Sequence, residues 1–263
     1  AKGNLYKVYN GNLLYHGCIP LNEDGSFKEV EIYGRKCKGK ALYECLDSYV
    51  RQAFVAIDGE ERKKGRDICW YIWLHENSPL FGKDKMATFE RYFLTEKETH
   101  KETKNPYYHF LENEEVMDRI LAEFGLAKEG AHIINGHVPV KSKNGENPVK
   151  CGGKVLVIDG GFSRAYQKET GIAGYTLIYN SYGLILAAHE PFESTEAAIE
   201  KESDIHSEST IVKRVSSRKL VGDTDVGKQL KTKIKDLEML LEAYHTGAIV
   251  ERFTVRKREI GGR

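Results

Sequence analysis

Residues 131–139 read AHIINGHVP, an apolar run that ends in a glycine and a histidine. A second run of this kind, LLYHGC at residues 13–18, ends in the same way. Both have strand character, so we expect His16 and His137 to lie at neighbouring strand ends with their rings facing one cleft. A histidine at the mouth of a buried strand can direct an imidazole nitrogen toward a divalent metal ion. Two histidines are half of such a site, and each can instead be a hydrogen-bonded structural group.

Two further segments of the sequence are distinctive. Residues 76–86 read ENSPLFGKDKM, and residues 151–164 read CGGKVLVIDGGFSR. Together with the two histidine runs, these blocks resemble the C-terminal part of class III fructose-1,6-bisphosphatase, the bacterial type built on the calcineurin-like metallophosphatase fold. The resemblance extends from about Lys2 to about Arg252. It implies an α/β (α+β) chain that forms the C-terminal part of an αββα sandwich with mixed β-sheets.

The metallophosphatase pattern has five motifs, and the chain holds the last two. His16 matches the fourth motif, with Cys18 in the place of its second glycine, and His137 matches the fifth. By resemblance, both imidazoles bind the same ion of a dinuclear pair, expected to be manganese. The first three motifs, which supply the carboxylates and the acid histidine, do not occur, so no residue here is assigned as catalytic. The chain begins at Ala1, which fits a piece of a longer polypeptide whose N-terminal part completes the site.

The resemblance also implies a substrate and a reaction. The complete enzyme would hydrolyse the 1-phosphate of fructose 1,6-bisphosphate to fructose 6-phosphate in gluconeogenesis, and this chain alone would be inactive. The loop at residues 77–85 breaks regular structure with Asn-Ser-Pro and Phe-Gly. In the family context we expect it to form a wall of the active site. Lys83 and Lys85 then either bind a sugar phosphate or belong to the solvated surface.

Other basic residues compete for the phosphate. Arg164 is the first candidate, because it follows a strand exit and its guanidinium can grip a phosphate at two points. Lys150 is a further candidate, with Lys141 and Lys143 near it. Asp159 can orient a metal-bound histidine through a hydrogen bond, or it can cap the turn that follows it at Gly161 or Phe162.

Composition limits the class of protein and its partners. The 263 residues are 40% hydrophobic, which suffices for a substantial core, and no composition change marks a boundary within residues 1–263. Lysine and arginine number 40 against 39 acidic residues, so no overall field attracts nucleic acid. No apolar run approaches the roughly 18 residues that span a membrane. Five cysteines without Cys-x-x-Cys spacing indicate reduced thiols and a cytoplasmic protein.

Periodicity predicts the main elements. We expect a strand at 11–19, strands at 131–134 and 154–158, and helices at 40–55 and 114–124. The text around Asn180-Ser181-Tyr182-Gly183 predicts a hairpin of strands 175–179 and 184–188. A late helix at 226–244 should bury one apolar stripe, and most of the aromatic residues between 70 and 93 should be core. The expected members of the stripe are Leu230, Ile234, Leu237, Leu241 and Tyr244.

Two other interpretations stay open. The first keeps the phosphatase chemistry but gives it another phosphoester, since a fold does not determine a substrate. The second is a non-catalytic regulatory or assembly module whose histidines are structural. In that case the helix at 226–244 would mediate self-association, and a homo-oligomer would result.

Overall fold

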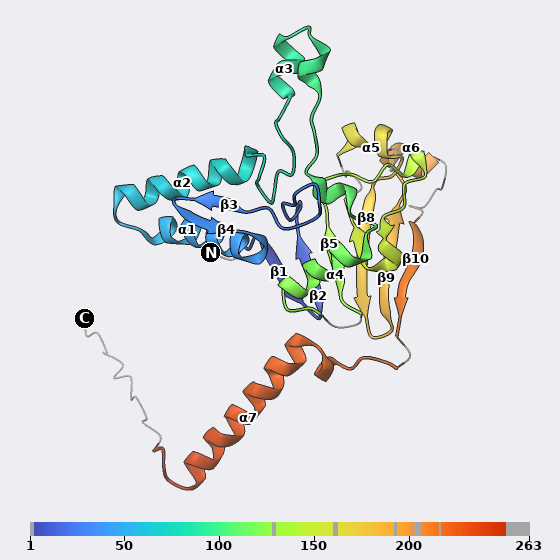
Figure 1. Ribbon diagram of the computed structural model, residues 1–263. Coiled ribbons are helices and arrows are strands. Elements are labelled where there is room, and N and C mark those ends of the chain that lie inside the picture. Colours follow the sequence, from blue (N-terminus) through green and yellow to red (C-terminus); the bar gives the residue numbers. More distant parts are fainter. Residues whose placement is uncertain are drawn as a thin grey trace, which may run out of the picture. The chain divides into compact units, whose positions relative to one another are not determined.

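A computed structural model shows how these elements are arranged (Figure 1). It describes residues 3–127, 130–159, 163–191, 194–200, 202, 207–215 and 217–250. The chain divides into two compact units, residues 1–216 and 217–263, at a point that no composition change marks. The predicted α+β class with mixed β-sheets is confirmed. All five cysteines are free thiols, as expected.

The central sheet of the first unit has the strand order β1-β2-β5-β7-β6. Its middle strands β2, β5 and β7 run parallel, while β1 and β6 pair antiparallel at the two edges. Every residue of β5 and β7 is buried, as is usual for parallel strands covered on both faces. The strands are β1 (Tyr6–Tyr9), β2 (Asn12–Tyr15), β5 (His132–Asn135), β6 (Val149–Lys150) and β7 (Val155–Val157).

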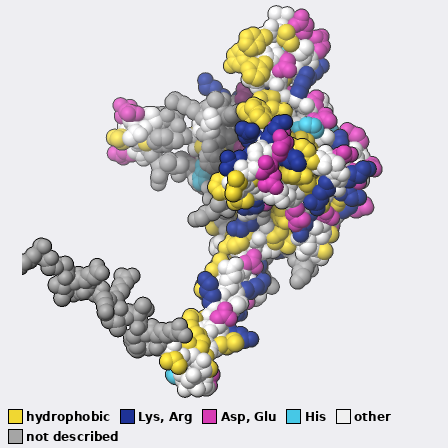
Figure 2. All heavy atoms as spheres, turned by 90° about the vertical axis from the view of Figure 1, so that its left-hand side faces the viewer, with side chains coloured by type: hydrophobic (Ala, Val, Ile, Leu, Met, Phe, Trp, Pro, Cys, Tyr) yellow, Lys and Arg dark blue, Asp and Glu magenta, His cyan; other side chains and the backbone are white. Residues whose placement is uncertain are grey.

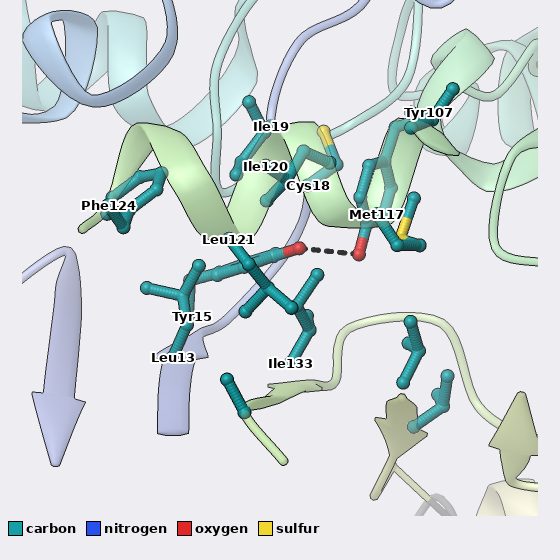
Figure 3. Packing of buried hydrophobic residues seen from close by; sticks show 14 of the residues in the cluster. Leu13, Tyr15, Cys18, Ile19, Tyr107, Met117, Ile120, Leu121, Phe124 and Ile133 are labelled. Atoms are coloured by element: carbon teal, nitrogen blue, oxygen red, sulfur yellow. Dashed lines mark hydrogen bonds between the residues drawn. The ribbon is translucent and has the colours of Figure 1, made fainter. Parts of the chain in front are cut away.

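Helix α4 (Glu114–Glu123) packs on one face of this sheet (Figure 3). Asn113 caps this helix, because its side chain accepts a hydrogen bond from the N–H of Val116. Within the core the hydroxyl groups of Tyr15 and Tyr107, the latter from η2 (Pro106–His109), lie 2.6 Å apart and satisfy each other. The apolar residues around them include Leu13, Cys18, Ile19, Met117, Ile120, Leu121 and Ile133.

A three-stranded antiparallel sheet of order β10-β9-β8 packs on the other face of the central sheet. Leu184 of this second sheet lies in one cluster with Ile134 and Leu156. Because neighbouring residues of a strand point to opposite faces, Ile133 faces α4 while Ile134 faces the second sheet. The predicted hairpin is confirmed. The three strands are β8 (Gly174–Asn180), β9 (Gly183–His189) and β10 (Ser207–Arg214).

A helical hairpin of α1 (Gly39–Val55) and α2 (Gly59–Leu74) forms a second core with the small hairpin β3 (Val30–Ile32) and β4 (Arg35–Cys37). The predicted helix at 40–55 is confirmed as α1. Gly65 lets the two helices approach closely, since a Cβ there would lie 1.9 Å from the Cβ of Ala53. Asp58 caps α2 by accepting from the N–H of Glu61.

A projecting arm extends from the first unit between residues 84 and 103 and carries α3 (Thr88–Phe93) and η1 (Lys97–His100) (Figure 1). The prediction that most aromatic residues between 70 and 93 belong to the core is wrong. Most of their side chains lie exposed on α2 and on the arm, and hydrophobic side chains are visible at the arm's tip (Figure 2). Five are 57–80% exposed, namely Trp70, Trp73, Phe89, Tyr92 and Phe93.

Four short helices complete the first unit, namely η3 (Ser142–Asn144), η4 (Cys151–Gly153), α5 (Arg164–Thr170) and α6 (Thr195–Glu200). The second unit holds η5 (Val221–Asp223) and α7 (Asp225–His245), which is the helix predicted at 226–244. The prediction that α7 buries its apolar stripe is wrong, because those side chains are 42–63% exposed. The described part of this unit offers α7 a single short turn and no sheet or second helix to pack on. No helix among the described residues is both long and apolar enough to cross a membrane.

Candidate metal centre

His16 and His137 meet at one edge of the central sheet. His16 follows the last residue of β2, and His137 lies two residues beyond the end of β5. The two strands are parallel neighbours with Leu14 opposite Ile134, so their carboxyl ends lie side by side (Figure 1). The backbone joins the two ends, because the N–H of Gly136 donates to the carbonyl of His16 at 2.9 Å.

The two imidazole rings are in direct contact. Nε2 of His16 and Nδ1 of His137 lie 3.0 Å apart, and the ring centroids are 4.9 Å apart. Ligating histidine nitrogens lie about 2.0–2.1 Å from a bound zinc ion. Two nitrogens 3.0 Å apart can therefore both reach one ion, at an angle near 90°. The expectation that His16 and His137 lie at neighbouring strand ends and border one cleft is confirmed.

The backbone around the pair is tightly constrained. His137 has φ of 66°, a left-handed conformation that side chains other than glycine rarely adopt. Gly17, beside His16, has no room for a side chain, since a Cβ there would lie 2.5 Å from the Pro79 carbonyl oxygen. The same carbonyl accepts a hydrogen bond from the N–H of Cys18. The loop at residues 77–85 thus packs directly behind His16, and its Leu80 lines the cavity at the pair.

Burial lowers the pKa of His137, and the charges of His16 and Lys83 lower it further. The Phe81 carbonyl and Asp159 act in the opposite direction but do not outweigh these effects. The neutral form of the ring, which is the form that ligates metals, is therefore favoured. A cavity of about 680 Å³ adjoins both histidines, and Asp159 contributes to its lining.

The histidine pair is the full extent of the ligand set that the structure shows. Within the described ranges, no group of three or more His, Cys, Asp or Glu side chains is placed to hold a metal ion. The backbone carbonyl of Asp159 accepts from the N–H of Val140 at 2.8 Å, which ties the ends of β7 and β5 together. Its predicted capping partners, Gly161 and Phe162, lie outside the described residues.

The predicted phosphate-binding residues do not all gather at this edge. Lys83 is close enough to act on the pKa of His137, but its Nζ pairs with Glu102 at 2.9 Å. Lys150 pairs with Glu146 at 3.5 Å. Neither these two lysines nor Lys85, which is half-buried, contributes to the described lining of the cavity. Arg164 is the first residue of α5, and its side chain lies outside the described part of the structure.

The sequence analysis missed two lysines, one that lines the cavity at the histidines and one that lies beside Lys83. Lys7 lines the cavity, because β1 pairs with β2 and sets Lys7 opposite Leu14. Lys104 forms an isolated β-bridge with Lys83, and burial lowers its pKa. Antiparallel pairing of residues 6–9 with the strand that ends at His16 could have indicated Lys7 from sequence. The sequence around Lys104 does not predict its position, because that position depends on how the arm closes at its base.

The fold is of the α+β class. At the carboxyl ends of its parallel strands, a histidine pair is placed where it can hold a divalent ion. The sequence profile of the Firmicute fructose-1,6-bisphosphatase family matches residues 1–246. The chain therefore belongs to this family.

Individual relatives agree with the profile. The chain is 58% identical over 253 residues to fructose-1,6-bisphosphatase class 3 of Clostridium novyi. It is 59% identical over 252 residues to the proteins of that name from Clostridium botulinum and Clostridium acetobutylicum. These matches cover 95–96% of the chain but 38% of each relative's length. No solved structure matches the chain.

Proposed function

We propose that this chain is the histidine-bearing part of a fructose-1,6-bisphosphatase, which hydrolyses the 1-phosphate of fructose 1,6-bisphosphate to fructose 6-phosphate and phosphate. The names of the relatives support the reaction and the substrate. The observation that carries the role of this chain is the 3.0 Å approach of two imidazole nitrogens at the ends of adjacent parallel strands. The remaining ligands we assign to an N-terminal part of a longer polypeptide. The proposed reaction belongs to gluconeogenesis in the cytoplasm of a bacterial cell.

In the proposed site His16 and His137 hold one ion of a dinuclear pair, with manganese as the expected metal. A bound pair of divalent ions acidifies a coordinated water and neutralises phosphoryl oxygens. The residues of this chain contribute position and protonation state. The two strand ends hold the imidazoles at a fixed separation, and the lowered pKa of His137 keeps its ring neutral. Asp159 lines the same cavity, where we propose that it orients a ligating histidine.

Substrate binding is assigned to the basic residues around this edge. We propose that Arg164 grips the non-reacting phosphate and that Lys83, Lys85 and Lys150 add positive charge around it. The effect of Lys83 on the pKa of His137 supports a location close to the metal pair. We add Lys104 to these proposed substrate-binding residues, because it forms a β-bridge with Lys83 at the base of the arm.

The test uses the longer protein that contains this chain. His16→Ala and His137→Ala should each lower kcat by more than about 100-fold, a loss larger than that caused by removing a group behind a ligand. Each variant should also retain less manganese after dialysis, measured by atomic emission. The control is His109→Ala, because His109 is an exposed histidine of η2. Full activity and full metal content in His137→Ala would remove the metal assignment, whereas a different preferred phosphoester in the unmodified protein would change the substrate alone.

A further inference from the structure

Helix α7 carries an apolar stripe that the second unit leaves exposed. Its members recur at steps of four and three residues, which places them on one face of the helix. Their exposed fractions range from 42% at Tyr244 to 63% at Leu237. The stripe consists of Leu230, Ile234, Leu237, Leu241 and Tyr244. The steps of four and three are those of the a and d positions of a heptad repeat.

The described contacts between η5 and α7 hold the first part of α7. Thr224 caps the helix by accepting from the N–H of Gly227. Gly227 packs so closely on η5 that a Cβ would lie 1.8 Å from the Val221 carbonyl oxygen. Lys231 donates to the Gly222 carbonyl at 3.1 Å. Beyond Lys231 the helix continues for 14 residues to His245. Most helical stability in proteins comes from packing of the apolar face. A helix that leaves this face exposed therefore lacks its main source of stability.

The residue types in the stripe favour a specific kind of partner. Ile234 and Leu241 take a positions, while Leu230, Leu237 and Tyr244 take d positions. The first half of the stripe therefore combines isoleucine at a with leucine at d. A β-branched residue at a with leucine at d favours parallel two-stranded coiled coils. The other apolar residues of the helix are Val226 and Leu240, which occupy g positions beside the stripe, and Met239 and Ala243 on the outer face, so the stripe is the single continuous seam. A helix of 21 residues is about 31 Å long and spans three heptads.

The charges beside the stripe are self-complementary. Lys233 occupies the g position that precedes Ile234, and Glu238 occupies the e position that follows Leu237. In a parallel pair, a g residue of one helix faces the e residue of the following heptad of the other helix. Lys233 of each copy would then meet Glu238 of the other, and two-fold symmetry makes this contact twice. A second copy of the same helix therefore satisfies both the apolar seam and its flanking charges.

We propose that α7 pairs with α7 of a second copy of this chain as a parallel two-stranded coiled coil. The pairing is independent of the phosphatase assignment, because it uses no residue of the candidate metal centre. It makes the second unit a dimerisation element.

The first test uses two exposed residues of the same helix. Leu237 lies in the stripe and Met239 lies on the outer face, and both side chains are 63% exposed. Light scattering coupled to size exclusion should give the 263-residue chain a mass of about 60 kDa, twice its 29.9 kDa. Leu237→Asp should return the mass to that of one chain, and Met239→Asp should leave the dimer intact. A monomeric unmodified chain would overturn the proposal, and so would equal behaviour of the two variants.

The second test checks the pairing and its direction without placing a charge in the seam. Lys233→Glu and Glu238→Lys should each weaken the dimer about 5- to 30-fold in Kd, because each change removes both symmetry-related ion pairs, at about 0.5–1 kcal/mol for each exposed pair. The double variant should restore the affinity. Leu237→Cys, combined with Cys69→Ser to remove the exposed native thiol, should form a disulfide between copies under mild oxidation. No restoration in the double variant, or no cross-link, would exclude the parallel register.

Discussion

Gly17 and Gly136 stand beside the two candidate ligands, but they serve different purposes. At Gly17 a Cβ would lie 2.5 Å from the Pro79 carbonyl oxygen and 2.8 Å from that of Leu80. At Gly136 the nearest atom to a Cβ would be 3.6 Å away, which is an ordinary contact. Position 136, before His137, can thus accept a side chain, whereas position 17, after His16, cannot. The absence of a side chain at Gly17 lets the loop at residues 77–85 approach the end of β2.

We predict that Gly17→Ala destabilises the chain by about 1–3 kcal/mol, because backbone atoms of the loop must move to admit the methyl group. The matched variant Gly136→Ala should cost less than about 1 kcal/mol. Urea denaturation followed by circular dichroism gives both values. Equal losses in the two variants would mean that the loop yields easily and that Gly17 is replaceable.

Arg164 permits a prediction about substrate binding rather than chemistry. If Arg164 grips the non-reacting phosphate equally in the ground state and the transition state, its removal raises KM and leaves kcat nearly unchanged. A charge-assisted contact of about 1.5–3 kcal/mol corresponds to a rise of about 10- to 150-fold. Steady-state kinetics of Arg164→Ala in the longer protein should show this split. The control is Lys168→Ala, an exposed residue of the same helix. An unchanged KM in Arg164→Ala would assign the phosphate to Lys83 and Lys85.

At the scale of elements, the arm is held at its base by two carboxylates, Glu102 and Asp84, and the Asp84 carboxylate accepts a hydrogen bond from the N–H of Thr103 at 2.7 Å. Glu102 accepts hydrogen bonds from Nζ of Lys83 at 2.9 Å and from the N–H of Ala87 at 3.0 Å, and it lies 3.6 Å from Arg91. Burial alone would raise the pKa of Glu102, but these hydrogen bonds and the two positive charges outweigh burial and lower it. The N–H of Asp84 donates to the carbonyl of Thr103 and completes the closure.

The lowered pKa predicts acid-sensitive opening of the arm. A carboxylate with a lower pKa in the folded state contributes stability above its unfolded pKa of about 4.3, and the contribution is lost as pH falls through the folded pKa. Hydrogen-exchange protection of residues 84–103 should therefore fall on acidification below about pH 4, after correction for intrinsic rates. Glu102→Gln should have an open arm at every pH. Glu98→Gln, an exposed residue of the same arm, should retain the pH dependence. Protection that does not change with pH in the unmodified chain would contradict this account.

The elements that the sequence predicted well are those with local signals. The periodicity of residues 114–124 predicted α4, and the turn at 180–183 predicted the β8–β9 hairpin. Burial was predicted less well, because burial depends on what another element covers. Leu237 reads as a core residue and is 63% exposed, and Trp73 reads as a core residue and is 60% exposed. His16 and His137 were predictable because each follows a strand and the two strands are parallel neighbours.

At the scale of the whole molecule, the candidate site is incomplete in the part of the chain that the structure describes. Two imidazoles meet, and no third ligand-type side chain joins them among these residues. A hard divalent ion takes six or more ligands, most of them oxygens, so a histidine pair leaves it under-coordinated. The chain spans 38% of the length of its relatives, which leaves most of each relative to supply the missing groups under the proposed function.

We therefore predict that the 263-residue chain alone hydrolyses fructose 1,6-bisphosphate no faster than buffer, even with manganese in excess. Without a bridging carboxylate, the chain cannot hold two ions close enough to share a water. Phosphate release measured by a colorimetric assay tests the activity, and calorimetric titration with manganese should show weak binding of at most one ion. The positive control is the longer protein under identical conditions, which should turn over substrate and bind two ions. Robust manganese-dependent turnover by the 263-residue chain would show that its own residues, including those outside the described ranges, complete the site. It would contradict the proposal that two parts of one protein share the site.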